Sequence, residues 1–343
     1  MAHRKHRPTA EHVGRPGAKP VSRESSSCYY QKDSEFFIVA ICRNCGSSDI
    51  LRLENGAHLA PFFAERVFGI KIGTKRSRKL QLSESILFRL TGFSLQRLTA
   101  LTTASMLCKS CTFLSTFQEI PEDLLTRLYV DYRTSTYNQD REKHEPGYEK
   151  TIAPHAGSLL EAEIRNHALN LYFKDLENKG IVTLANSKKI LDWGGADGRF
   201  LPDFPIATEN YVFEVSDCSP VAGVERIEAT PNTPIFDYIQ IAHVLEHISN
   251  PAGFIKKPLA NLAPGGILYL EVPMEVDLSC FLEQVETQKF PFYVHEHINK
   301  YTPKSLENLA LSNGLKVLDV RLDFVELAWT KADIIRLIAL KPH

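Results

Sequence analysis

The first features to note in this 343-residue sequence are the ones it lacks. It lacks a large net charge, because its 40 Lys and Arg residues are balanced by 41 Asp and Glu residues. The formal net charge of −1 therefore gives no electrostatic reason to expect nucleic-acid binding. No apolar run approaches the length that crosses a bilayer, and the N-terminus lacks the apolar core of a signal peptide. These absences predict a cytoplasmic protein without a membrane partner.

Among the features that are present, the most informative is an apolar strand that ends in an acidic, glycine-rich turn, residues 190–198 (ILDWGGADG). Glycines in such a turn let the backbone bend tightly and approach a ligand without Cβ interference. A nucleotide-like ligand can then lie at the carboxyl end of the strand. The alternatives are an ordinary strand-to-helix turn and a dinucleotide site, although acids at Asp192 and Asp197 would repel a pyrophosphate. Those acids suit the cationic amine of a methionine instead.

Further apolar strands follow in regular order. The strand at 211–215 contains Glu214, an acid at the offset that suits the hydroxyls of a ribose. A third strand at 235–241 runs into His243, and a Gly-Gly turn leads into a fourth strand at 267–272. Two more strands are predicted near the end of the sequence, after a helix that closes at Asn313-Gly314.

This order of motifs resembles the class I S-adenosylmethionine (SAM)-dependent methyltransferases. Their first motif is Asp-x-Gly-x-Gly-x-Gly, and the chain matches it except that Ala196 replaces the middle glycine. The run 243–251 (HVLEHISNP) is also similar to that family, and the likeness extends over roughly residues 155–341. The resemblance implies a Rossmann-like α/β fold with a seven-stranded sheet, and SAM as the cofactor. The residues it implies for the cofactor are Asp192, Gly194, Gly195, Ala196, Gly198, Glu214 and His243.

Seven cysteines are present, and four of them form two C-x-x-C pairs. Two such pairs supply four thiolates, the ligand set of a closed structural zinc site, in a compartment where thiols stay reduced. The alternative is that they are ordinary core or surface residues. The predicted zinc ligands are Cys42, Cys45, Cys108 and Cys111.

Methyl transfer to oxygen or carbon also requires the removal of a proton, so a general base is expected near the acceptor. The candidate is His295-Glu296-His297, since imidazole titrates near neutral pH and a neighbouring carboxylate can orient it. The alternative is a structural turn whose imidazoles cap backbone carbonyls. His243, Glu246 and His247 are weaker candidates.

A cysteine module before the core and the run 295–302 (HEHINKYT) after it resemble the sugar C-methyltransferases that act on nucleotide-linked keto-sugars. In that family a His-Glu-His segment supplies the base that abstracts a proton next to the keto group. The resemblance implies His297 as that base, with Glu296 and His295 beside it. The family's tyrosine directly before this segment is Val294 here, with Tyr293 one place earlier, and the family's further α/β domain is not expected. Oxygen or nitrogen methylation of a sugar or glycan precursor stays open beside carbon methylation.

Three parts are predicted along the chain: a disordered tail at 1–34, a zinc-binding and linker module at 35–150, and the methyltransferase domain at 151–343. Within the module, the middle segment 60–103 is expected to form strands and a short helix. Its basic residues meet either a phosphate or only solvent: Lys71, Lys75, Arg76, Arg78, Lys79, Arg89 and Arg97.

The linker of that module is rich in tyrosine, and its tyrosines line a substrate cleft or pack an interface: Tyr129, Tyr132, Tyr137 and Tyr148. A covering helix is predicted over 158–180. The apolar side chains expected to face the sheet are Leu159, Leu160, Ile164, Ala168, Leu171 and Phe173.

Two other functions stay open. One is a catalytically inactive, methyltransferase-like subunit with a binding or scaffolding role, which the retained acids Asp192 and Glu214 disfavour. The other is an RNA methyltransferase delivered by its zinc module, which the neutral charge disfavours, as does the lack of an Asn/Asp-Pro-Pro-Tyr/Phe motif after Ile241. The expected partner is therefore a small-molecule acceptor, a nucleotide sugar, and the oligomeric state is open.

Overall fold

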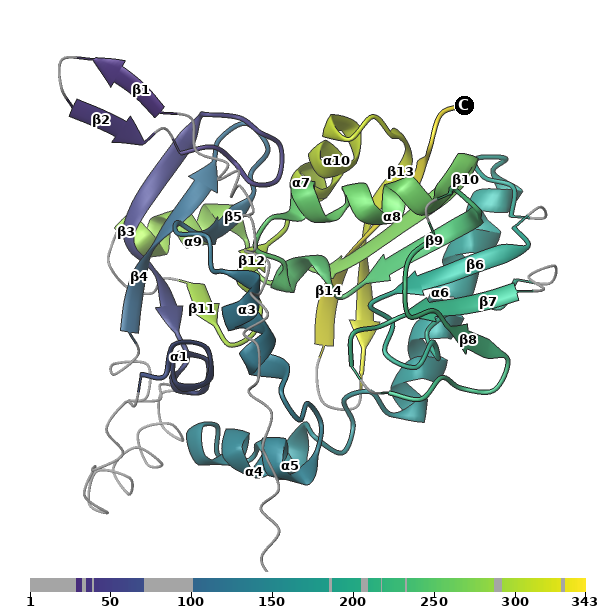
Figure 1. Ribbon diagram of the computed structural model, residues 1–343, viewed down its shortest axis with the longest axis horizontal. Helices are drawn as coiled ribbons and strands as arrows, with labels where there is room; N and C mark the ends of the chain where they lie inside the picture. Colours follow the sequence, from purple (N-terminus) through teal and green to yellow (C-terminus); the bar gives the residue numbers. More distant parts are fainter. Residues whose placement is uncertain are drawn as a thin grey trace, which may run out of the picture. The chain divides into compact units, whose positions relative to one another are not determined.

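The computed structural model describes residues 29–32, 35–38, 40–70, 101–184, 187–204, 209–216, 218–231, 233–286, 292–327 and 331–343 (Figure 1). The chain divides into two units, Met1–Val39 and Ala40–His343. In the first unit, strands β1 (Tyr29–Lys32) and β2 (Glu35–Ile38) pair antiparallel, with Tyr30 opposite Phe37. Strand β1 overlaps the predicted tail at residues 29–32. The rest of segment 1–34 lies outside the described residues.

The described part of the second unit contains a seven-stranded sheet with the order β13-β14-β10-β9-β6-β7-β8. The strands from β10 to β8 pair in parallel, whereas β14 and β13 run antiparallel. This arrangement confirms the predicted mixed α/β fold and both C-terminal strands. In chain order the strands are β6 (Lys189–Trp193), β7 (Glu209–Phe213), β8 (Val224–Arg226), β9 (Phe236–Ala242), β10 (Leu262–Pro273), β13 (Lys316–Glu326) and β14 (Lys331–Leu340).

Helices cover both faces of this sheet, so its central strands are apolar on both sides (Figure 1). Alternate residues of β6 point to opposite faces, since Ile190 packs with helix α6 and Leu191 with the helices of the other face. The covering helices are α6 (Leu159–Asn178) on one face, and α7 (Pro251–Phe254), α8 (Lys256–Asn261) and α10 (Pro303–Ser312) on the other.

Helix α6 has the predicted position, and Phe173 is buried as predicted, but three of the predicted buried leucines are not. Leu159, Leu160 and Leu171 are exposed at 68%, 51% and 54%. The side chains buried from this helix are Ala162, Leu169, Tyr172, Phe173 and Leu176. Aromatic residues fill the space over the sheet because they bury more apolar area per side chain than leucine does.

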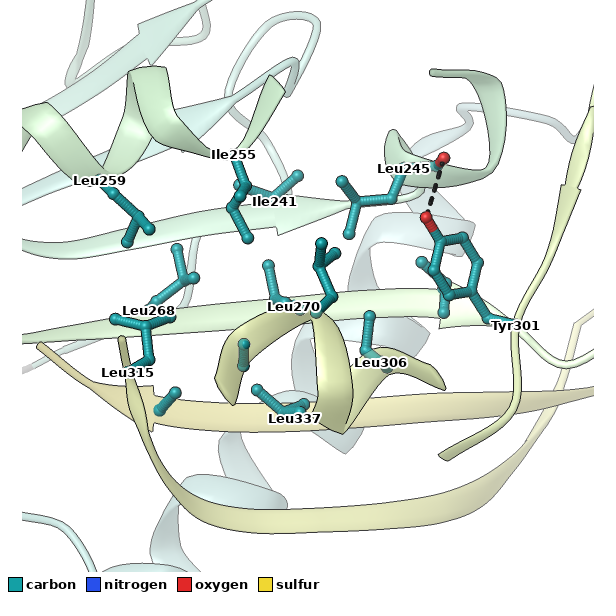
Figure 2. Close-up of a cluster of buried hydrophobic side chains, with 14 of the residues drawn as sticks. Ile241, Leu245, Ile255, Leu259, Leu268, Leu270, Tyr301, Leu306, Leu315 and Leu337 are labelled. Atoms are coloured by element: carbon teal, nitrogen blue, oxygen red, sulfur yellow. Dashed lines mark hydrogen bonds between the residues drawn. The ribbon is translucent and has the colours of Figure 1, made fainter. Parts of the chain in front are cut away.

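The apolar core beside α10 holds a short 3₁₀ turn, η3 (Leu245–His247), that follows β9 (Figure 2). Figure 2 shows Leu245 among the core side chains, with the hydroxyl of Tyr301 directed at its backbone oxygen, 3.4 Å away. The side-chain amide of Asn299 also donates to the backbone oxygens of Leu245 and Ile248, at 2.9 and 2.7 Å. These bonds fix η3 against the segment 299–301.

A second sheet, five-stranded among the described residues, has the order β11-β3-β4-β5-β12. It combines β3 (Ile50–Leu59), β4 (Leu101–Cys108) and β5 (Leu114–Thr116) with β11 (Phe292–Val294) and β12 (Asn299–Lys300). Helix α1 (Pro61–Phe68) supplies the predicted short helix, and the basic side chains at 71–97 lie outside the described residues. The N-terminal module and the segment around 295–297 therefore share one sheet.

Short helices link the two sheets: α3 (Glu122–Leu125), η2 (Thr126–Tyr129), α4 (Ser135–His144) and α5 (Tyr148–Thr151), with α9 (Leu278–Glu286) farther along the chain. Tyr137 and Tyr148 are buried in the core of the second sheet, so these two tyrosines serve as packing. None of the helices in the described ranges has the length and apolar character needed to span a membrane.

Candidate functional site

The glycine-rich turn leaves the carboxyl end of β6. Gly194 and Gly198 have φ of +79° and +78°, and Ala196 has +53°, so the backbone repeatedly enters the left-handed region. A Cβ added to Gly195 would lie 2.0 Å from Cγ of Asp192, which means that the turn folds closely over that side chain. The predicted turn is therefore present as a cradle of nearly bare backbone.

Asp192 lies beneath this cradle and is 1% exposed. Its burial raises its pKa from 3.8 to about 7, against the opposing charge of Arg165 and a hydrogen bond with Gln240. Among the described residues its Oδ2 has no hydrogen-bond partner. A buried acid with an unused oxygen under a glycine cradle fits the cationic methionine end of SAM.

Glu214 follows β7 directly and joins the two strand ends. Its Oε2 accepts from the backbone N–H of Ala196 at 3.0 Å, and its Oε1 accepts from the N–H of Ser216 at 2.8 Å. An ionised carboxylate has about four acceptor positions, so these two bonds leave room for two hydroxyl groups. Glu214 thus fits the ribose contact that the sequence predicts.

His243 follows β9 and belongs to a buried ion-pair network at the carboxyl ends of the parallel strands. Its Nδ1 lies 3.3 Å from Oε1 of Glu246, and its Nε2 lies 3.2 Å from Oε1 of Glu271. Burial and the charge of Arg165 lower the pKa of His243, but the two carboxylates outweigh them and raise it to about 9. We conclude that His243 is a cation held between two acids.

Glu271 holds this network in place. It pairs with Arg165 of α6 at 2.9 Å and with Arg336 of β14 at 3.1 Å, and it accepts from the hydroxyl of Tyr269 at 2.6 Å. Burial would raise its pKa, but the surrounding cations hold it well below the ordinary value. This one carboxylate of β10 therefore joins helix α6 and strand β14.

Glu246 and His247 lie in η3, beside His243. Glu246 is 1% exposed, and its contact with the His243 cation overcomes its burial and lowers its pKa to about 2. For His247, burial and the charge of His297 lower the pKa to about 3, so the imidazole is neutral. Its Nδ1 lies 2.7 Å from the hydroxyl of Tyr129, which brings the N-terminal module to the site.

His297 stacks edge-on against His247, with ring centroids 4.7 Å apart. Its Nδ1 lies 2.9 Å from Oε1 of Glu275, which also pairs with Lys300. Burial would raise the pKa of Glu275, but the hydrogen bond from His297 and the charge of Lys300 lower it far below its usual range. An ionised Glu275 only accepts, so Nδ1 of His297 carries the proton.

Glu296, the predicted companion of His297, contacts other residues. Its carboxylate is paired with Arg141 and accepts from the hydroxyl of Tyr137 at 3.4 Å. Residues 295–296 form a bend after β11, and therefore the acid beside His297 in sequence is not beside it in space. The expectation that Glu296 orients His297 is corrected: Glu275 does so.

His295 lies beside Glu145 and Tyr293. The side chain of His295 is 49% exposed, with Nδ1 3.3 Å from Glu145. The ring of Tyr293 packs edge-on against His295 with centroids 4.3 Å apart. Of the four predicted catalytic residues, His297 contacts the η3 turn through its side chain, and Glu296 contacts it through its backbone oxygen.

Residues 165–320, which contain this edge of the sheet, match the model of a family described as a methyltransferase domain. The similarity to the methyltransferase family therefore extends over this segment of the chain. No curated protein matches the chain significantly.

Several solved structures are similar to about half of the chain. A SAM-dependent methyltransferase from Mesorhizobium loti shares 12% identity, covering 48% of this chain and 95% of its own, with a TM-score of 0.34. The N-methyltransferase NodS from Bradyrhizobium japonicum WM9 shares 17% identity over 50% and 97%, with a TM-score of 0.34. A SAM-dependent methyltransferase from Leishmania major shares 15% over 52% and 72%, with a TM-score of 0.39. At these low scores, none of these structures tells us what the methyltransferase domain acts on.

The sequence pattern did not single out three residues of this candidate site. Glu275 follows β10, and its position two residues after the strand was the only signal that could have drawn attention to it. Tyr129 belongs to the tyrosine-rich linker, whose role was left open. Arg165 lies on α6, and nothing in the sequence ties that helix to Asp192 in β6.

The four predicted zinc ligands come together next to the methyltransferase domain. Each sulfur lies within 4.8 Å of the other three, and the pairs Cys42–Cys111 and Cys45–Cys108 are 3.7 Å apart. Tetrahedral zinc with bonds of about 2.3 Å holds its sulfurs about 3.8 Å apart. A disulfide would need about 2.05 Å, so the four thiols are arranged as a metal-ligand set.

The tetrad is fixed to the methyltransferase domain. The side-chain amide of Asn44 donates to the backbone oxygen of Ser305 at 2.8 Å, and the N–H of Ala252 donates to the oxygen of Arg43 at 3.0 Å. In addition, β5 pairs with β12, and Ser115 donates to the side chain of Asn299 at 2.9 Å. The cysteine module therefore supports the segment that contains His297.

Proposed function

We propose that this protein transfers a methyl group from SAM to a small polar acceptor, a nucleotide-linked sugar or a related glycan precursor. When bound, SAM supplies an electrophilic methyl group on a sulfonium. The glycine cradle, Asp192 and Glu214 would hold its methionine and ribose parts. Holding donor and acceptor in line accounts for a large part of such catalysis.

The single observation that carries the acceptor chemistry is the pairing of His297 with Glu275, 2.9 Å apart. Because this carboxylate keeps the proton on Nδ1, the Nε2 lone pair of His297 is available to take a proton from the acceptor. The predicted role of His297 as the base is thus kept, with Glu275 in place of Glu296 as its orienting acid. Carbon and oxygen acceptors both need this step.

A sugar nucleotide is proposed as the acceptor because the segment 295–302 and the cysteine module resemble the sugar C-methyltransferases. Tyr129 and His247 offer further polar groups beside His297, as a hydroxyl-rich acceptor requires. For the cysteine tetrad we propose a structural zinc ion, supported by the sulfur spacing and by the bonds that tie the module to Ser305 and Asn299.

The first experiment is calorimetric titration of the zinc-loaded protein with S-adenosylhomocysteine, followed by methyl-transfer assays on nucleotide-linked keto-sugars. One-to-one binding together with methylation of a nucleotide sugar would support the proposal. Absence of binding by folded protein would overturn the cofactor assignment. If the protein binds S-adenosylhomocysteine but methylates a free amine or a phenol and no nucleotide sugar, the proposed acceptor class is wrong.

A further inference from the structure

Three side chains of the site form a metal-ligand set that is separate from the cysteine tetrad. Glu246, His247 and His297 each have one ligand atom within 4.8 Å of a ligand atom of the other two. Two imidazoles and one carboxylate are a common donor set for divalent transition metal ions, which also accept water at the remaining positions.

The second ring nitrogen of each histidine is already held. Nδ1 of His297 donates to Glu275, as described above. Nδ1 of His247 lies 2.7 Å from the Tyr129 hydroxyl and 3.3 Å from the backbone oxygen of Glu296, which can only accept. A proton on Nδ1 satisfies these contacts, so in both rings the free lone pair is on Nε2. Metal-bound histidines are usually held in this way, with the other N–H donated to a carboxylate or carbonyl.

Glu246 gives an independent indication. It is 1% exposed, and neither of its carboxylate oxygens has a hydrogen-bond partner among the described residues. His243 provides an ion-pair contact at 3.3 Å, but not a hydrogen bond of acceptable geometry. A buried carboxylate normally has its acceptor positions filled, and a bound cation would fill these.

We propose that Glu246, His247 and His297 bind one divalent transition metal ion of the zinc or cobalt class. Bonds of about 2.0–2.2 Å place neighbouring ligand atoms about 3–4 Å apart. Oε1 of Glu246 and Nε2 of His247 are 4.0 Å apart, so the three side chains need only close in slightly.

The site has a consequence for catalysis that rests on the proposed function. The Nε2 lone pair of His297 can bind a metal ion or accept a proton from the acceptor, but not both. Metal bound here therefore inhibits methyl transfer, and it leaves the glycine cradle and cofactor binding unchanged. The metal forms coordinate bonds only, with no change in oxidation state.

The test is a Co²⁺ titration of protein whose cysteine tetrad already holds zinc. We expect about one further equivalent of Co²⁺, with weak visible bands and without the intense sulfur-to-cobalt absorption that thiolate ligands produce. His247→Ala and Glu246→Gln should lose this equivalent and keep the tetrad zinc. Tyr129→Phe should weaken Co²⁺ binding by roughly 10- to 100-fold. His167→Ala, at an exposed histidine of α6, is the control and should bind as the wild type does.

If the zinc-loaded wild type takes up no second equivalent, or if the variants bind it as well as the wild type, the site does not exist. Retained tetrad zinc and unchanged circular dichroism show that the variants fold. X-ray absorption of the Co²⁺-loaded wild type, which should show imidazole ligands and no sulfur, tests the site without any variant. Stimulation of turnover by Co²⁺ would overturn the inhibitory role. Binding of S-adenosylhomocysteine, measured in parallel, reports separately on the proposed function.

Discussion

Nδ1 of His297 lies 2.9 Å from the carboxylate of Glu275, a residue 22 positions earlier that follows β10. The same carboxylate also pairs with Lys300, so one acid fixes both the imidazole and the start of the segment that leads into α10. The pairing explains how a histidine on an irregular segment keeps one orientation and one tautomer. The predictions below test this pairing, the cofactor cradle and the cysteine module.

Glu275→Gln should lower kcat by roughly 10²- to 10⁴-fold, because an amide no longer holds the proton on Nδ1 of His297 as a carboxylate does. Steady-state kinetics with the identified acceptor measure this change, and the Kd of S-adenosylhomocysteine should stay the same. Glu296→Gln is the matched variant. It breaks the pair with Arg141 and should therefore lower Tm, whereas its kcat should fall much less than that of Glu275→Gln. The assignment fails if Glu296→Gln is the slower enzyme and Glu275→Gln keeps wild-type kcat.

Asp192 should make both stability and cofactor binding depend on pH. Its folded-state pKa of about 7 exceeds the ordinary 3.8, so its contribution to stability is present below pH 4 and is lost as the pH rises through 7. Asp192→Asn should therefore gain stability relative to the wild type between pH 4 and 8, by on the order of a few kcal/mol. Thermal unfolding across that range measures the difference.

The cationic amine of the cofactor should favour ionised Asp192. Binding of S-adenosylhomocysteine at pH 6 is then expected to release a proton, which calorimetry in buffers of different ionisation enthalpy detects. In Asp192→Asn both the proton release and most of the affinity should disappear. If the difference in stability between the two proteins is the same at pH 4 and pH 8, the pKa of Asp192 is not raised by folding.

Gly195→Ala should damage the cradle by steric overlap alone, because its Cβ would lie 2.1 Å from Oδ2 of Asp192. We expect a loss of about 1–3 kcal/mol in the free energy of unfolding, together with loss of cofactor binding. Gly180→Ala is the control: it has φ of +65° but open space around the Cβ. It should lose about 1–2 kcal/mol from backbone strain and still bind S-adenosylhomocysteine. Normal cofactor binding by Gly195→Ala would show that the turn rearranges freely.

Cys45→Ser should remove the tetrad zinc and reduce turnover as well as stability. The tetrad supports β5, and β5 pairs with β12 beside His297. Loss of the metal is therefore expected to make the position of the His297 side chain less fixed. Unfolding free energy should fall by on the order of several kcal/mol. Zinc analysis, thermal unfolding and kcat measure the three effects, with Cys218→Ser, at an exposed cysteine, as the control. Full turnover by the zinc-free variant would show that the cysteine module is not needed to position His297.

The sequence by itself determined the features that depend on neighbouring residues. The acid and glycines at the end of an apolar run predicted strand β6 and the tight turn that follows it. Each C-x-x-C pair likewise predicted a local turn that brings its two sulfurs together. The order of apolar strands was also sufficient for the α/β fold, because the central strands β6, β9 and β10 are buried on both faces and read as apolar runs.

Tertiary structure decided the contacts that join distant segments. Which face of α6 is buried depended on the aromatic residues available to cover the sheet, and apolar spacing alone selected Leu159 and Leu171 wrongly. The acid beside His297 comes from the segment that follows β10, because the bend at residues 295–296 turns Glu296 toward Arg141. Pairing of β5 with β12 brought the cysteine module and the histidines into one sheet, and such long-range pairing leaves no local pattern in the chain.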